Sequence, residues 1–114
     1  MYCIEHYLTA NGHNDPYASW LSRLKDSRMK VSVIRRVARL EQGNFGDHKF
    51  CKDGVWELRL DVGPGVRIYY ALAGKRVVLL LGGGDKGSQA TDIQTAVNNW
   101  NDWQRRTDDE KQAP

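Results

Sequence analysis

Polar and apolar residues alternate in two neighbouring segments, 55–62 and 66–72. This period of two predicts two β-strands, each with one apolar and one polar face. Guanidinium groups bind phosphate in bidentate fashion and can stabilise charge that develops in a transition state. The polar faces therefore indicate phosphodiester chemistry, with lysines at nearby strand and loop ends. The candidate residues are Glu57, Arg59, Asp61, Arg67 and Tyr69, flanked by Lys49 and Lys86.

The segment Gly63-Pro64-Gly65 between the two strands determines which side chains face each other. A three-residue loop keeps the apolar faces aligned, because it places Asp61 opposite Arg67 and Arg59 beside Tyr69. We therefore expect that loop. A second interpretation of the same residues stays open, namely a solvated ladder of ion pairs that joins Asp61 to Arg67 and Glu57 to Arg59.

Several other kinds of site are not supported by the sequence. The glycine-rich segment 82–87, interpreted as a flexible loop, lacks the G-x-x-x-x-G-K-[ST] pattern of a phosphate-binding loop. It is also not a G-x-G-x-x-G fingerprint in the parallel β-α-β setting of dinucleotide sites. The three histidines show no metal-binding spacing, so we expect no metal site and no cofactor. Cys3 and Cys51 are expected to be reduced thiols that are buried as small hydrophobes.

The remaining elements must position the polar strand faces. Their pattern predicts an α+β fold in which two N-terminal helices pack on a mainly antiparallel sheet of four to five strands, followed by a C-terminal helix. Asp15 and Pro16 mark the start of the first helix, and Ser88 is the expected cap of the last. The expected ranges are strand 2–8, helix 16–25, helix 29–42, edge strand 48–52 ending in the Asp53-Gly54 turn, and strand 76–81.

The length and the charge of the chain indicate its domain number, its location and the kinds of partner that it suits. The 114 residues predict one domain, 1–104, followed by a disordered tail, 105–114. No apolar run approaches the length of a membrane span, and no export signal precedes the first strand, so we expect a cytoplasmic protein. Seven positive residues against Asp26 alone lie between Arg23 and Arg39, although the whole chain has a net charge of only +3. That segment suits RNA, a ribosome or an acidic partner, and equally a merely solvated helix face.

Three segments, ARLEQGNFGDHK, GVWELRLDVGPGVRIYY and VVLLLGGGDKGSQATDIQTA, resemble in order and spacing the signature segments of the HigB-like addiction module killer proteins, a branch of the RelE/ParE toxin superfamily. With PYASWLSRLKD, the resemblance runs from about Pro16 to Trp100. It implies a type II toxin that inhibits growth as a metal-independent mRNA endoribonuclease, acting in the ribosome. It also implies a helix-turn-helix, HigA-like antitoxin, which would form a hetero-oligomer with the toxin and bind operator DNA.

The resemblance also assigns roles. It places the phosphate-contacting arginine at Arg67 and a basic position at Lys86. Arg59 and Glu57 lie in its E-L-R segment and Lys49 in its G-D-x-K segment. Arg67, Lys86, Arg59, Glu57 and Tyr69 are then the catalytic candidates, and Lys49, Arg59, Arg67 and Lys86 the RNA-binding ones.

The sequence also departs from the family pattern. Val66 replaces the usual tyrosine before the key arginine, and residues 89–93 offer only Thr91 and Asp92 where many members carry a catalytic aromatic residue or histidine. The general acid and base are therefore open, with Tyr69, Glu57 and Asp92 as candidates. Two other functions stay open too: a ParE-like inhibitor of DNA gyrase, and an inactive regulator that only binds antitoxin.

Overall fold

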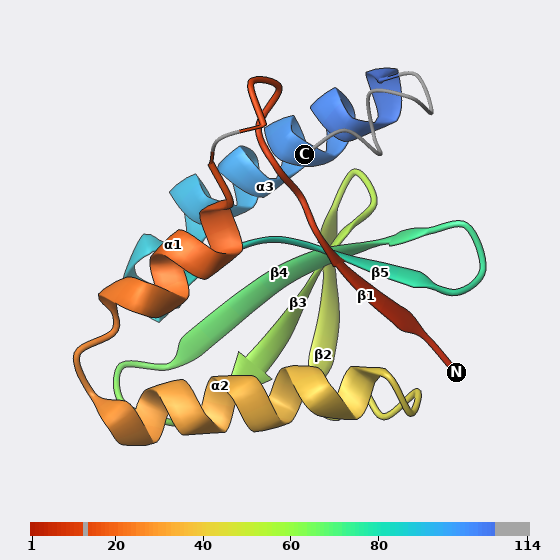
Figure 1. The fold of residues 1–114 in the computed structure, drawn as a ribbon. Coiled ribbons are helices and arrows are strands. Elements are labelled where there is room, and N and C mark those ends of the chain that lie inside the picture. The colour runs from red at the N-terminus through yellow and green to blue at the C-terminus, as the bar shows by residue number, and fades with distance from the viewer. Residues whose placement is uncertain (13, 107–114) are drawn as a thin grey trace.

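The structure is a computed structural model that describes residues 1–12 and 14–106 (Figure 1). This part of the chain has an α+β fold, which confirms the predicted class: three α-helices and a five-stranded sheet in the order β1-β5-β4-β3-β2. β1 pairs in parallel with β5, and the other strand pairs are antiparallel. The elements are β1 (Cys3–His6), α1 (Pro16–Arg23), α2 (Ser27–Leu40), β2 (His48–Lys52), β3 (Val55–Leu60), β4 (Val66–Ala73), β5 (Val77–Asp85), the 3-10 helix η1 (Lys86–Ser88) and α3 (Gln89–Arg105).

The helices cover both faces of the sheet, with α1 and α2 on one side and α3 on the other (Figure 1). Successive side chains of a strand point to opposite faces of the sheet, so the hydrophobic core forms two clusters, one on each face. Residues such as Leu58 and Ile68 face α1 and α2, whereas Tyr69, Ala71 and Leu79 face α3. The polar face predicted from the sequence is therefore the α3 face of the sheet.

Aspartates set the starts of both N-terminal helices. The Asp15 side chain accepts a hydrogen bond from the backbone N of Ala18 at 2.9 Å, as the sequence predicts. α2 begins at Ser27 rather than at the expected Met29, because Asp26 caps it by accepting from the backbone N of Arg28 at 2.8 Å. The lone acidic residue of the basic segment thus serves the helix terminus.

The link between β3 and β4 is longer than predicted. Leu60 lies opposite Val66 and Arg59 opposite Arg67, so residues 61–65 form the connection and the three-residue loop is wrong. The backbone N of Gly65 donates to the carbonyl O of Val62 at 3.0 Å, which closes a tight turn within this longer loop. The pairing differs from the expected one by an even number of residues, so every side chain keeps its predicted face.

The glycine-rich segment is also not the expected loop. β5 continues through Gly82, Gly83 and Gly84 to Asp85, paired with β4. A Cβ atom built on Gly83 would lie 2.3 Å from the Trp20 ring, and one on Gly84 1.9 Å from a carboxylate oxygen of Asp92. Glycine is required here because α1 and α3 press on opposite faces of the same short piece of strand.

The junction with the last helix differs from prediction as well. Ser88 is the N-cap residue of α3, as expected, but its side chain makes no capping hydrogen bond to that helix. The Asp85 side chain caps the preceding η1, accepting from the backbone N of Gly87 at 2.8 Å. The Ser88 hydroxyl instead donates to Asp92.

The predicted Asp53-Gly54 hairpin turn is present, with φ of 50° and 87° at its two residues, as a type I′ turn requires. The expected tail overlaps α3, since Arg105 ends that helix and Arg106 donates to the Tyr7 hydroxyl at 3.3 Å. The rest of the predicted tail, 107–114, lies outside the described residues. The expected burial of both cysteines is wrong, because Cys3 is exposed on the edge strand β1 and Cys51 is only half-buried.

Candidate nucleic-acid interface

Strand pairing gathers the candidate residues of the sheet in two adjacent rows on the α3 face. Lys49 pairs with Glu57, and Glu57 pairs with Tyr69, which forms one row across β2, β3 and β4. Arg59 pairs with Arg67 in the next row, and Gly84 follows on β5. Five of the predicted site residues are thereby neighbours, even though the loop that joins β3 to β4 differs from prediction.

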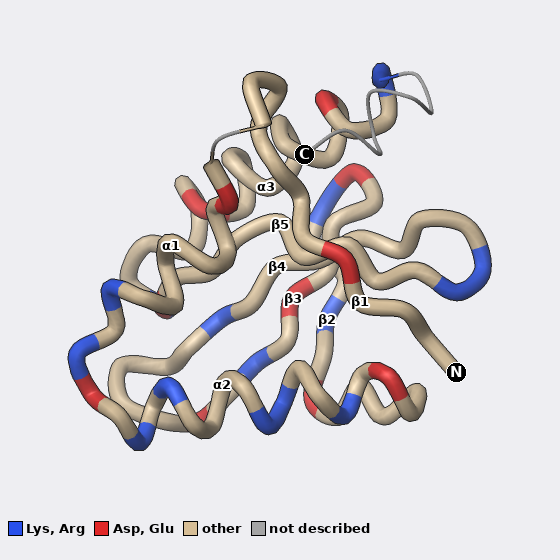
Figure 2. The backbone as a smooth tube through the Cα atoms, viewed as in Figure 1, with Lys and Arg blue, Asp and Glu red and all other residues tan. Residues whose placement is uncertain are grey.

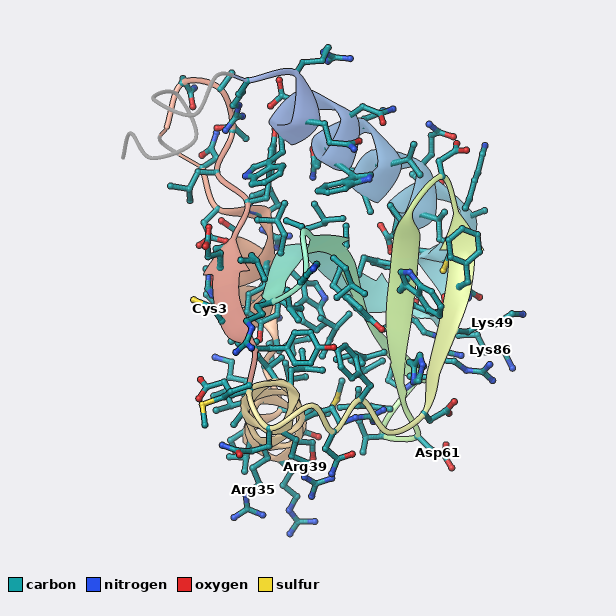
Figure 3. All side chains as sticks on the ribbon, turned by 90° about the vertical axis from the view of Figure 1, so that its right-hand side faces the viewer. Cys3, Arg35, Arg39, Lys49, Asp61 and Lys86 are labelled. Carbon is teal, nitrogen blue, oxygen red and sulfur yellow. The ribbon has the colours of Figure 1, made fainter. Side chains whose placement is uncertain are left out.

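Lys86 joins this group through the turn that follows β5. Its backbone N donates to the carbonyl O of Gly65 at 2.8 Å. A Cβ atom on Gly65 would lie 3.3 Å from the Lys86 Cβ and 3.6 Å from the Arg67 Nη1, so this glycine adjoins both cations. Figure 3 shows Lys49 and Lys86 projecting on the same side of the molecule, away from α2.

Glu57 is the buried centre of the site, with a relative exposure of 1%. Its Oε1 accepts from Gln89 Nε2 at 2.7 Å and from the Cys51 thiol at 3.4 Å. Its Oε2 lies 3.4 Å from Arg67 Nε and 3.9 Å from Arg59 Nε. Burial, together with this carboxylate, raises the pKa of the Cys51 thiol to about 12, so Cys51 is a neutral donor here.

Arg67 lies at the boundary between this buried centre and solvent. Its side chain is 10% exposed, its Nη1 donates to the carbonyl O of Val66 at 3.1 Å, and its Nε faces Glu57 without a hydrogen bond of good geometry. Because Gly65 has no side chain, nothing on that residue blocks the approach to Nη1. The guanidinium is thus held in one orientation, with its Nη1 next to Gly65.

The remaining cations are accessible. Lys49 and Lys86 are exposed, and the Arg59 side chain is 40% exposed between Glu57 and Asp47, whose carboxylate lies 3.8 Å from Arg59 Nε. The expected ion-pair ladder is only partly present. Arg67 approaches Glu57 and not Asp61, since Asp61 lies beyond the end of β3 and is exposed.

Three of the catalytic candidates are buried, and two of them, Tyr69 and Glu57, are almost fully enclosed. Tyr69 is 0% exposed, and its hydroxyl has no hydrogen-bond partner in the described part of the chain. Burial raises the Tyr69 pKa, and the charges of Glu57 and Asp92 add to the effect. The side chains of Tyr69 and Glu57 are therefore not presented to solvent in this structure.

The structure also adds residues that the sequence did not single out. Gln89 and Cys51 complete the hydrogen bonding of Glu57, and Ser88 engages Asp92. Thr91 is exposed and its carbonyl accepts from Thr95 within the helix. Gln89 lay within the segment considered for the missing catalytic group, but no spacing rule links the first residue of α3 to a carboxylate 32 positions away on β3.

Other kinds of site are not apparent in residues 1–12 and 14–106. No group of three or more His, Cys, Asp or Glu side chains is arranged to hold a metal ion there. No helix of that region is long and apolar enough to cross a membrane.

The fold and the site define a small α+β domain with a cation-lined sheet face built around one buried carboxylate. Residues 19–100 match the family described as phage derived protein Gp49-like (DUF891), and the chain belongs to this family. It is also 48% identical over 80 residues to an uncharacterized protein of Haemophilus influenzae, an overlap of 70% of this chain and 81% of that protein. The family match, 19–100, nearly coincides with the segment from about Pro16 to Trp100 that resembles the addiction module killer proteins.

Proposed function

We propose that this protein is the HigB-like toxin of a type II toxin-antitoxin module and inhibits growth by cutting mRNA. The observation that carries the proposal is the cation-lined face, where Arg67 is fixed by Glu57 and the accessible Arg59, Lys49 and Lys86 surround it. The resemblance of three long segments to addiction module killer proteins supports the same function, as does membership of the Gp49-like family.

The proposed reaction is attack by a ribose 2′-oxygen on the adjacent phosphorus. A bond from the 2′-oxygen to phosphorus forms, the bond from phosphorus to the 5′-oxygen breaks, and the proton passes from the 2′-hydroxyl to the leaving oxygen. Because the attack is intramolecular, alignment of the nucleotide supplies much of the rate. Arg67 would hold the phosphate as negative charge builds, and Arg59, Lys49 and Lys86 would bind the flanking phosphates.

Burial limits which of the candidate residues can transfer a proton to or from the substrate. Of the three candidates from the sequence, Asp92 alone is partly exposed, so it is the one we retain as a proton acceptor or donor. Glu57 is proposed as a positioning residue for Arg67. Its two oxygens already face Gln89, Cys51 and two guanidinium groups, an arrangement that favours a chemical step without a divalent metal at this carboxylate.

The proposed partners follow from the same function. The substrate would be mRNA on the ribosome, in the cytoplasm, where ribosomal RNA helps to position it. A helix-turn-helix, HigA-like antitoxin would neutralise the protein in a hetero-oligomer that binds operator DNA.

The decisive experiment is primer extension on ribosome-bound mRNA after addition of purified wild-type protein, Arg67→Ala or Arg67→Lys. We expect Arg67→Ala to lower the cleavage rate by about 10² to 10³ fold, since it removes a preorganised donor. Arg67→Lys should also be damaging, because a point charge cannot reproduce the fork of a guanidinium. Arg76→Ala is the matched control, an exposed arginine in the turn between β4 and β5, and should cleave like the wild type.

Each contrary result has a distinct meaning. Equal cleavage by the wild type and Arg67→Ala would remove Arg67 from the reaction. Absence of cleavage by every protein would reject the nuclease. A parallel supercoiling assay would then identify a gyrase inhibitor, and normal growth on overexpression would identify an inactive regulator.

A further inference from the structure

The outward face of α2 carries an apolar stripe that the proposed nuclease does not use. Val31 and Ile34 are 46% and 54% exposed, unusual values for large aliphatic side chains. Ala38 is exposed as well, one turn beyond Ile34. The spacings of three and four residues place these side chains next to one another along one face of the helix.

Arginines run beside this stripe. Arg28, Arg35 and Arg39 are exposed and follow each other at helical spacing, and α2 contains no acidic residue from Ser27 to Leu40 (Figure 2). None of these three arginines takes part in an ion pair within the described residues. Figure 3 shows Arg35 and Arg39 projecting away from the sheet.

Arg36 differs from the exposed arginines of α2 because its side chain is hydrogen-bonded to the backbone of other elements. It turns inward and donates to the carbonyl oxygens of Arg59 and Phe45, each at 2.9 Å, and to that of Asp47. This arginine therefore ties α2 to the sheet and to the loop before β2. The outward arginines have no such structural task.

An open hollow of about 310 Å³ adjoins the arginines, between α2 and the end of β3. Its walls combine guanidinium groups with apolar side chains, and Asp61 is the acidic group that faces them. The lining residues are Ser32, Arg35, Arg36, Arg39, Leu60, Asp61 and Val62. A partner's carboxylate side chains could enter beside the arginines while its aliphatic side chains cover Ile34 and Val31.

We infer that α2 docks an acidic amphipathic helix of a protein partner. A second copy of this chain fits poorly, because two such faces would bring arginines against arginines. Nucleic acid satisfies the arginines but leaves Val31 and Ile34 without an apolar contact. A helix with aliphatic side chains at positions i, i+3 and i+7 and carboxylates along one flank matches both stripes.

The natural source of that helix, the antitoxin, rests on the proposed function. The inference that the α2 surface binds such a helix does not depend on the proposed function, because α2 and the site with Arg67 lie on opposite faces of the sheet. An antitoxin bound there would neutralise the toxin without filling the cation-lined face directly.

The test is selection from a yeast-displayed library of helical peptides with randomised surface positions, with the Arg67→Ala protein as bait. We expect enrichment of acidic peptides with aliphatic residues at helical spacing. Their affinity should fall about tenfold for Ile34→Ser and for Arg35→Glu combined with Arg39→Glu. Circular dichroism and urea unfolding of each variant would show that these surface changes leave the fold intact.

Matched controls lie elsewhere on the surface. Phe50→Ser changes another exposed hydrophobe, and Lys75→Glu combined with Arg76→Glu reverses two exposed cations, so both should bind within about twofold of the parent protein. The inference would be overturned if acidic helices were not enriched, or if the substitutions at Ile34 and Arg35 left the affinity of the selected peptides unchanged. It would also be overturned if single-stranded RNA alone bound this face. This experiment measures peptide binding and not mRNA cleavage. A positive result would therefore remain valid even if the protein proved not to be a nuclease.

Discussion

At the scale of single residues, Glu57 organises the candidate site without touching solvent. A buried carboxylate is costly unless its charge is compensated, and here two arginines, an amide and a thiol surround it. The charge of Glu57 in turn orients Arg67, which is itself 10% exposed. The two residues therefore depend on each other.

Removal of Glu57 should accordingly destabilise the fold. We expect Glu57→Ala to lower the free energy of unfolding by about 3 to 5 kcal/mol, because it leaves a buried guanidinium unpaired. Glu57→Gln should cost less, since it preserves shape and part of the hydrogen bonding. Urea unfolding measures both, with the exposed Glu5→Ala as control. A loss of under about 1 kcal/mol for Glu57→Ala would mean that the ion pair has little structural weight.

At the scale of elements, the three consecutive glycines of β5 bring α1 and α3 close to the sheet at one point. Gly83 lies beneath Trp20 and Gly84 beneath Asp92, while a Cβ on Gly82 would meet no atom within 4 Å. Gly83 and Gly84 therefore make room for helix side chains and Gly82 does not, although the three glycines are consecutive in the sequence.

This difference predicts opposite outcomes for two neighbouring substitutions. Gly83→Ala should lower the free energy of unfolding by about 1 to 3 kcal/mol or more, because the methyl group must displace a large ring packed on the sheet. Gly82→Ala should be neutral or raise it by a few tenths, because it restricts the unfolded chain without a clash. Thermal unfolding of the two variants checks the contrast, and similar losses for both would contradict the packing argument.

At the scale of the whole molecule, buried tyrosines lie in both core layers. Burial is the main cause that raises the pKa of Tyr7 and Tyr17 to about 12 from the ordinary 10.0, and it also raises the pKa of Tyr69 and Tyr70. The Tyr7 hydroxyl donates to Asp102 at 2.6 Å, and Arg106 covers its ring at 5.0 Å from the centroid. The end of α3 is thereby joined to the residue that follows β1.

These tyrosines predict a loss of stability in alkali. Below pH 10 both states keep their phenol protons; above it the unfolded chain loses them first, so the free energy of unfolding falls until the folded pKa of about 12 is passed. Each tyrosine contributes at most about 1.4 kcal/mol per pH unit. Urea titrations from about pH 9 to about pH 11 measure the slope. Tyr17→Phe should make it shallower, and an unchanged slope would remove Tyr17 from the explanation.

The amino-acid sequence alone determined the fold class, the order of the helices and strands, and the strand faces. Alternation of polar and apolar residues assigns Glu57, Arg59 and Arg67 to one face whatever the loop length, because a shift by an even number of residues preserves the face. The helix cap Asp15 and the hairpin turn Asp53-Gly54 are equally local signals, since each acts within a few residues of the backbone.

Only the tertiary structure decided which side chains of the polar face are accessible. α3 covers Tyr69 and Glu57 because its apolar side needs the same sheet face, whereas Lys49 and Lys86 stay outside it. The glycines of β5 belong to the sheet because they pair with β4, and Gln89 meets Glu57 only after α3 has docked. Such contacts depend on packing between elements far apart in the chain, and no local spacing encodes them.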